Sequence, residues 1–428
     1  MQLPPQIVIH RAAEEIGGSC IEISSGVNRI LLDFGLPLSA AKEKKAAREY
    51  RLPLAGAYKD QIPQFDAVFL THAHPDHYGL LAELNPEIPV YAGRATVNLL
   101  QNVAPLYGIS LSHLRFVTIS PEETVKYGGI SITAIAVDHS APQAFAYQVE
   151  TAGKTILYTG DLRAHGKCGY LTHGLARYAG PDYMLMEGTT LSRPGKISET
   201  ESELQLRLEK EFSATGLPVI YFSSQNLDRF VSVYKATRAL KKTLVIDPYT
   251  CYVLEQFRHL GRNIPQWNWR GIRVYFAANS ITEKLGERIF RYAGRKISLK
   301  DILLHPEQFV IKDNFSIRRS LLKRSADINL IHSSWEGYLK EEDNAFRQDA
   351  LTHNLPISVI HTSGHGDYNT LRSLVNKLSP RLLIPVHTEC PGRYGELFDV
   401  PVRVLKNGEV LFLQNQPQKE NRTADSAA

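Results

Sequence analysis

Short apolar runs recur along the first 190 residues of the chain, and an ionisable residue follows most of them. Examples are the runs 67–70, 130–137, 155–158 and 183–186. Aliphatic and β-branched runs of this length, bounded by polar turns, are typical of buried strands. The pattern therefore predicts a β-rich region in which several strands end at a possible ligand or acid.

From about residue 195 the pattern changes, because apolar strands now alternate with helical stretches. Strands are predicted at 218–222, 243–247, 272–276 and 328–331. Alternation at this spacing favours a parallel α/β domain. After residue 350 the chain returns to strands that end in histidines. We therefore expect the following division: one domain formed by 1–194 and 351–413, an inserted domain at 195–350, and a disordered polar tail at 414–428.

Composition and charge restrict the class of protein further. The 428 residues are 43% hydrophobic and 22% charged, and the net charge is +5. No apolar window is long enough for a membrane helix, the N-terminus lacks a signal pattern, and four scattered cysteines are typical of a reducing cytoplasm.

Two charged segments have local interpretations. An Ala- and Lys-rich surface helix is expected over 40–51. Eleven basic and five acidic residues between 280 and 325 are open to two interpretations, a solvated helix face or a track for a phosphate backbone.

Possible metal-binding side chains are most concentrated in the six residues from His72 to His77, which contain three imidazoles and one carboxylate. They form a turn between the strand at 67–70 and the next helix. Imidazole nitrogen and carboxylate oxygen suit zinc and its first-row neighbours. His72 and His74 are two residues apart on an extended backbone, so they can face one centre. Asp76 and His77, beyond Pro75, can face a second centre nearby.

Three further ionisable residues follow strand ends: His139, Asp161 and Glu187. Taken singly, each has an ordinary explanation, as a loop residue, a turn residue or a partner of a helix cap. Their repetition after successive strands favours a shared site instead.

At this point the chain resembles a known family. His72-Ala73-His74-Pro75-Asp76-His77 matches the HxHxDH signature of the metallo-β-lactamase fold. Glu187, His365 and His387 resemble the later motifs of its β-CASP branch, which comprises nucleases. The resemblance covers residues 6–413. It implies an α/β protein, in which a metallo-β-lactamase αββα sandwich carries an inserted Rossmann-like parallel α/β β-CASP domain.

The resemblance also implies two divalent metal ions, zinc or alternatively manganese, with a bridging hydroxide that attacks a phosphodiester. The implied ligands are His72, His74 and His139 for one ion, Asp76, His77 and His387 for the other, and Asp161 for both. Asp33 would orient the ligands. Asp76, His365 and Glu187 are the implied catalytic residues, with His365, held by Glu187, contacting the scissile phosphate or protonating the leaving oxygen. A neighbouring phosphate would contact His361, Ser363, Gly364 and Arg229, although Arg229 fits a structural salt bridge equally well.

In this branch RNA-acting members, such as ribonuclease J, have a histidine at the position of His387, whereas DNA-repair members typically have valine. The resemblance therefore implies a cytoplasmic, metal-dependent ribonuclease that acts on single-stranded RNA. Ribonuclease J usually has a further C-terminal domain that supports dimerisation, and this chain stops soon after the last strand. A homodimer and the exo- or endonuclease mode therefore stay open. The alternatives are a DNA nuclease of the same superfamily, a hydrolase of small esters or lactones, and a nucleic-acid-binding protein without activity.

Overall fold

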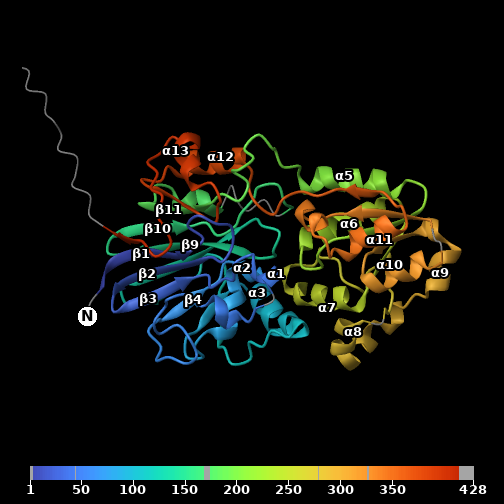
Figure 1. Cartoon of the computed structure of the whole chain (residues 1–428), viewed down its shortest axis with the longest axis horizontal. Helices are drawn as coiled ribbons and strands as arrows, with labels where there is room; N and C mark the ends of the chain where they lie inside the picture. The colour runs from blue at the N-terminus through green and yellow to red at the C-terminus, as the bar shows by residue number, and fades with distance from the viewer. Residues whose placement is uncertain (1–2, 44, 168–173, 278, 325–326, 414–428) are drawn as a thin grey trace, which may run out of the picture.

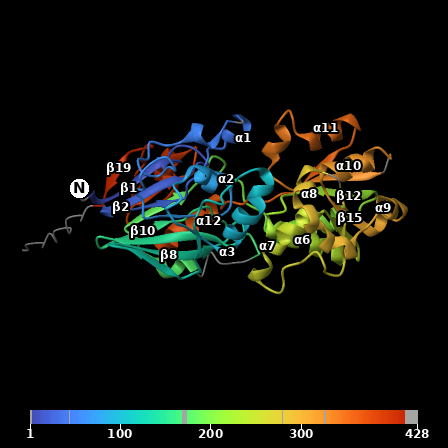
Figure 2. The same cartoon turned by 90° about the horizontal axis from the view of Figure 1, so that it is seen from below.

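Three β-sheets organise the chain (Figures 1 and 2). The computed structural model describes residues 3–43, 45–167, 174–277, 279–324 and 327–413. Two of the sheets lie together on the left of Figure 1, and the third lies on the right among helices. The tail expected to be disordered, 414–428, lies outside the described residues.

The first sheet has seven strands in the order β19-β1-β2-β3-β4-β5-β6. Their bounds are β1 Leu3–Arg11, β2 Cys20–Gly26, β3 Asn28–Leu32, β4 Ala67–Phe69, β5 Val90–Ala92, β6 Phe116–Thr118 and β19 Val410–Phe412. Strands β3 and β4 are parallel. Their carboxyl ends therefore meet at one edge, which brings Asp33 next to the segment that begins at His72.

The second sheet has six strands in the order β18-β11-β10-β9-β8-β7. Their bounds are β7 Thr124–Tyr127, β8 Ile130–Val137, β9 Ala144–Thr151, β10 Lys154–Tyr158, β11 Tyr183–Glu187 and β18 Leu383–Val386. Strands β10, β11 and β18 are parallel, and β9 is antiparallel to both β8 and β10. Strands β8, β10, β11 and β18 therefore all end at the same edge, although they come from distant parts of the chain.

An apolar core fills the space between these two sheets. It includes Ile9 and Phe69 from the first sheet and Ile132, Leu185 and Ile384 from the second, all fully buried. Separate apolar clusters join the outer face of each sheet to helices. These outer elements are α2 Pro75–Tyr78, η2 Gly79–Glu83, α3 Arg94–Asn98, η3 Leu99–Val103, η4 Ala104–Tyr107, η5 Leu175–Tyr178, α12 Tyr368–Leu378, η10 Pro391–Arg393 and α13 Tyr394–Leu397.

The third sheet has only parallel pairs, in the order β14-β13-β15-β12-β16-β17. Its strands are β12 Leu217–Tyr221, β13 Thr243–Ile246, β14 Ile272–Val274, β15 Phe309–Lys312, β16 Ile328–His332 and β17 Ile357–Val359. Helices α5 to α7 pack on one face and α9 to α11 on the other. The surrounding elements are α5 Glu201–Phe212, α6 Leu227–Ala239, α7 Pro248–Gln256, η6 Arg258–Leu260, α8 Ser280–Leu285, η7 Gly286–Arg295, α9 Leu299–Leu304, η8 Pro306–Gln308, α10 Phe315–Leu322, η9 Glu336–Lys340 and α11 Ala345–Thr352.

The predicted fold class is confirmed: two facing sheets with outer helices, and a parallel α/β unit inserted between their strands. The third sheet extends to Val359, past the expected limit at 350, and the domain division itself stays a prediction. The single helix expected over 40–51 is wrong, since α1 covers only Ala40–Glu43 and the 3-10 helix η1 covers Ala47–Tyr50. Neither buries a residue, so packing does not stabilise a longer helix. Among the described residues no helix has the length and apolarity needed to cross a bilayer.

Candidate metal centre

Three imidazoles meet where β4 and β8 end. The Nδ1 atom of His74 lies 2.9 Å from Nε2 of His72 and 3.2 Å from Nε2 of His139. Tetrahedral zinc with metal–nitrogen distances of ~2.0–2.1 Å places neighbouring ligand atoms about 3.3 Å apart. The spacing of these three nitrogens therefore suits one metal ion that they share.

A second group of possible ligands lies beside the first and consists of Asp76, His77, Asp161 and His387. Oδ2 of Asp161 is 3.2 Å from Nε2 of His77, and Oδ2 of Asp76 is 3.2 Å from Nε2 of His387. The same Asp161 oxygen is also 3.8 Å from Nε2 of His72. Asp161 is thus within reach of both groups.

Two buried atoms in this cluster support a metal-binding interpretation. Nε2 of His77 and Oδ1 of Asp161 have no hydrogen-bond partner among the described residues. A buried polar atom without a partner carries a desolvation cost that a bound cation removes. The donor set of imidazole and carboxylate suits a divalent ion, so the residues present fit such a metal.

The electrostatics keep several of these groups in the form that binds cations. Burial, reinforced by the neighbouring imidazoles, holds the pKa of His72 and of His139 well below the usual value. Burial also lowers the pKa of His74 to about 4. Burial opposes ionisation of Asp161, but His387 and His77 outweigh it and hold its pKa well below the usual range. The imidazoles of His72, His74 and His139 are therefore neutral and able to bind a cation, whereas the carboxylates of Asp161, Asp33 and Asp76 outweigh burial and raise the pKa of His77 well above its usual value.

Hydrogen bonds to the other ring atoms fix the orientation of the histidines. Asp33 is central, since its Oδ2 lies 2.8 Å from Nδ1 of His77 and accepts the hydroxyl hydrogen of Tyr158 at 2.8 Å. The hydroxyl of Thr71 donates to Asp33 and lies 2.9 Å from Nδ1 of His72. These contacts leave Nε2 of both histidines directed at the cluster. Tyr158 and Thr71 were not identified from the sequence, although Tyr158 is the last residue of β10 and Thr71 directly precedes His72.

His365 lies at the edge of the same cluster. Its Nδ1 is 3.0 Å from Oε2 of Glu187 and 3.7 Å from Oδ2 of Asp161. Burial alone would lower the pKa of His365, but the two carboxylates raise it to about 9. Glu187 and His365 also form, with Asp161 and His387, a group whose ligand atoms lie within 4.8 Å of one another. The geometry therefore permits two roles for His365, an acid or a ligand.

Comparison with known proteins agrees with this geometry. A family model described as a β-lactamase superfamily domain matches residues 28–209, and one described as a Zn-dependent metallo-hydrolase RNA specificity domain matches 354–392. Ribonuclease J of Mycolicibacterium smegmatis is 25% identical over 374 residues, which are 78% of this chain and 60% of that protein.

The chain has the metallo-β-lactamase fold, and over most of its length it is similar to proteins named ribonuclease J. Ribonuclease TTHA0252 of Thermus thermophilus is 33% identical over 233 residues, half of this chain and 51% of that protein. A crystal structure of a protein of unknown function from Enterococcus faecalis V583 superposes with a TM-score of 0.77 at 20% identity, covering 96% of this chain and all of that one. This last likeness concerns the fold alone. The chain spans less than two thirds of the length of the first curated relatives it matches.

The loop after β17 contributes mainly internal contacts. The carbonyl oxygen of Gly364 lies 2.6 Å from Nδ1 of His139, and the hydroxyl of Ser363 accepts from the backbone N–H of His365. His361 is half-buried, and burial together with the Arg229 charge lowers its pKa to about 3. The loop therefore orients His139 and His365, and its expected phosphate contacts stay a prediction.

Arg229 was expected either to contact phosphate or to form a structural salt bridge, and the phosphate contact stays a prediction. Arg229 is fully buried, and its guanidinium donates to the Glu201 carboxylate, to Ser333 and to the carbonyl of Thr362. These acceptors engage each of the three guanidinium nitrogens, which leaves little hydrogen-bonding capacity for a substrate. The salt-bridge alternative is the one that the structure supports.

A buried charge network adjoins Arg229 and was not identified from the sequence. Arg163 is fully buried and contacts the carboxylates of Asp138, Asp228 and Glu201. It lies two residues after Asp161, and Asp138 directly precedes His139. The network therefore connects the metal-ligand loops to α5 and α6 of the inserted unit.

Proposed function

We propose that this chain is a metal-dependent ribonuclease that hydrolyses phosphodiester bonds of single-stranded RNA. The observation that carries the proposal is the arrangement of two ligand groups around Asp161 with His365 at their edge. The match to an RNA specificity domain over 354–392, which includes His365 and His387, supports RNA as the substrate.

In this proposal His72, His74 and His139 would hold one divalent ion and Asp76, His77 and His387 a second, with Asp161 within reach of both groups. Zinc suits these donors, with manganese as the competitor. Bound ions of this kind supply a water of lowered pKa and neutralise the charge that develops on a phosphodiester.

The protein itself supplies orientation and a proton. Asp33 and Thr71 hold the imidazoles of His77 and His72 so that Nε2 faces the cluster. Glu187 keeps His365 protonated, and His365 contacts the scissile phosphate or gives its proton to the leaving oxygen. Most of the ligands are almost fully buried, with His72 0% and Asp161 2% exposed, while His74 and Asp76 are partly buried. A deeply placed cluster is reached more easily by a single strand than by a duplex.

The test uses a 5′-monophosphorylated, 3′-labelled RNA, its duplex form and the DNA of the same sequence. Each is incubated with the protein and zinc or manganese, with a chelator as control. We expect chelator-sensitive cleavage of single-stranded RNA, and the product lengths distinguish exonuclease from endonuclease activity. Cleavage of DNA alone, or of a chromogenic lactone alone, would replace the proposal with one of the other hydrolase functions. Light scattering on the same sample tests the homodimer.

A further inference from the structure

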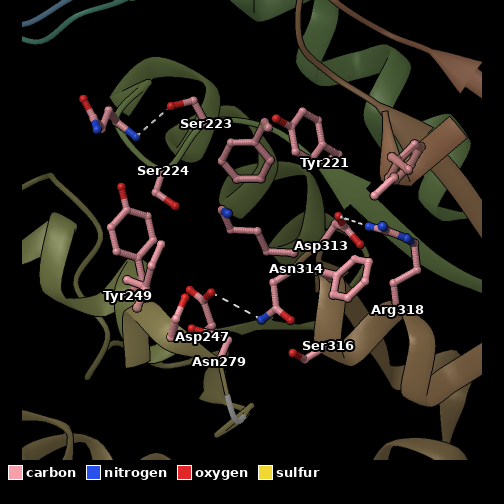
Figure 3. Close-up of a pocket in the computed structure, with 18 of the residues that line it drawn as sticks. Tyr221, Ser223, Ser224, Asp247, Tyr249, Asn279, Asp313, Asn314, Ser316 and Arg318 are labelled. Carbon is pink, nitrogen blue, oxygen red and sulfur yellow. Dashed lines mark hydrogen bonds and ion pairs between the residues drawn. The ribbon is translucent and has the colours of Figure 1, made fainter. Parts of the chain in front are cut away.

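A cavity lies away from the candidate metal ligands, at the carboxyl edge of the third sheet. Its volume is about 550 Å³, and it opens where β12, β13 and β15 end, around Tyr221, Asp247 and Lys312 (Figure 3). None of the candidate metal ligands lines it. Crevices at the carboxyl ends of parallel strands are common ligand sites, and this volume suits a small molecule.

Three helices begin at the wall of this cavity. Their capping residues, Asp247 for α7, Asn314 for α10 and Asn344 for α11, all line it. Each capping side chain accepts one backbone N–H from its own first turn. The positive ends of three helix dipoles therefore meet at one cavity. The Asp247 carboxylate already caps α7, whereas the caps of α10 and α11 are neutral, so the starts of these two helices favour an anion.

Lys312 gives an independent indication of an anion. Its side chain lines the cavity and is only 7% exposed. Nζ lies 5.0 Å from the ring centre of Phe222, yet among the described residues it has neither a hydrogen bond nor an ion pair. Burial lowers the pKa of Lys312. The carboxylates of Asp247 and Asp313 offset part of this effect, but neither forms an ion pair with the ammonium, so an anionic ligand would reduce its remaining desolvation cost.

The two carboxylates of the cavity have partners already. Asp313 forms an ion pair with Arg318 at 2.5 Å, and Asp247 accepts from the first turn of α7 and from the side-chain amide of Asn314 at 3.3 Å (Figure 3). Neither carboxylate pairs with Lys312, which leaves the ammonium available to a ligand.

Aromatic rings form much of the remaining wall. Tyr107, Tyr221 and Phe315 line the cavity and are 51%, 36% and 50% exposed. Tyr249 lies opposite Tyr221 across the labelled residues of Figure 3. Exposed aromatic faces beside a cationic group suit a planar base that is attached to a phosphate.

We propose that this cavity binds a 5′-mononucleotide, with the phosphate at Lys312 and the starts of α10 and α11 and the base against the aromatic wall. The inference goes beyond the proposed function, because the site is separate from the metal ligands. A free nucleotide and a terminal nucleotide of a longer strand offer the same chemistry, so the experiment includes both.

The test is calorimetric titration of the full chain, in the presence of chelator, with AMP, adenosine and ribose 5-phosphate. We expect AMP to bind at least about tenfold more tightly than either fragment, since only AMP carries both groups. Lys312→Met should weaken AMP binding by about tenfold or more. The matched control is Lys300→Met, which removes an exposed lysine from α9 and should leave the affinity unchanged.

A second variant keeps the test independent of any effect of Lys312 on folding. Phe315→Ala removes a half-exposed ring, and it should weaken AMP binding while leaving ribose 5-phosphate unaffected. Displacement of AMP by a 5′-phosphorylated oligoribonucleotide identifies a strand end as the natural ligand, and failure to displace it identifies a free nucleotide.

Three results would overturn the proposal. The first is no binding of AMP to the native chain, and the second is binding of AMP to folded Lys312→Met with the same affinity as to the native chain. The third result is loss of AMP binding in Asp76→Asn, which would place the nucleotide at the metal centre. Because the titration needs neither metal nor cleavage, its failure is distinct from failure of the proposed ribonuclease activity.

Discussion

Nη2 of Arg163 lies 2.7 Å from Oδ2 of Asp228, and this buried ion pair connects the loop after β10 to helix α6. The guanidinium also contacts Asp138 at 3.2 Å. Since Arg163 follows Asp161 by two residues and Asp138 directly precedes His139, the pair couples the position of two candidate ligands to the inserted unit.

Asp228→Asn should therefore lower the free energy of unfolding. We expect a loss of about 1–3 kcal/mol, because the buried guanidinium keeps Asp138 but loses a charged partner. Urea denaturation measures the change. The matched control is Asp399→Asn, at an exposed and distant ion pair with Arg372, where the change should stay within about 0.5 kcal/mol. Equal effects of the two variants would show that the Arg163 pair does not stabilise the fold.

Asp33→Asn should weaken metal binding without disturbing the backbone. Asp33 has a φ of +60°, and asparagine tolerates this left-handed conformation better than most other residues with a side chain. The amide cannot match the carboxylate as a partner of His77, so we expect metal affinity to fall by about 10- to 100-fold. Competition with a fluorescent chelator gives the affinity. Tyr158→Phe, which removes only one hydrogen bond to Asp33, should have a smaller effect, and an unchanged affinity in Asp33→Asn would contradict an orienting role.

Local sequence was sufficient to identify most residues of the candidate site. The ligands at 72–77 lie in one motif, and His139, Asp161 and Glu187 each follow an apolar run that forms a strand. Whether these strand ends meet depends on sheet order, which no local pattern contains. The resemblance to a known family provided that information, and the parallel pairing of β10, β11 and β18 explains it physically.

Properties that depend on distant contacts could not be predicted in this way. Arg229 and Lys312 are ordinary basic residues in the sequence, and both are almost fully buried in the structure. Arg163 and Asp228 are 65 residues apart, so their pairing is not visible locally. The positive φ of His387, +52°, likewise follows from its place at the end of β18 and not from its residue type.

Arg229→Lys distinguishes the structural role of this residue from a substrate contact. Lysine keeps the charge but cannot reach Glu201, Ser333 and Thr362 together. We therefore expect the free energy of unfolding to fall by about 2–3 kcal/mol. The KM for RNA, measured well below the unfolding temperature, should not change. A raised KM with unchanged stability would instead support the phosphate contact.

His365→Gln addresses the open question of whether this residue is an acid or a ligand. As an acid bonded to Glu187, His365 acts only on substrate, so the variant should lose about 10²–10⁴-fold in cleavage rate and keep its full metal content. The rate is measured at saturating metal, and the metal content by mass spectrometry of the dialysed protein. Asp76→Asn is the comparison, because it removes a candidate ligand and should release one metal equivalent. If His365→Gln also releases one, then the group formed by Asp161, Glu187, His365 and His387 binds a metal, and the proton for the leaving oxygen has another source.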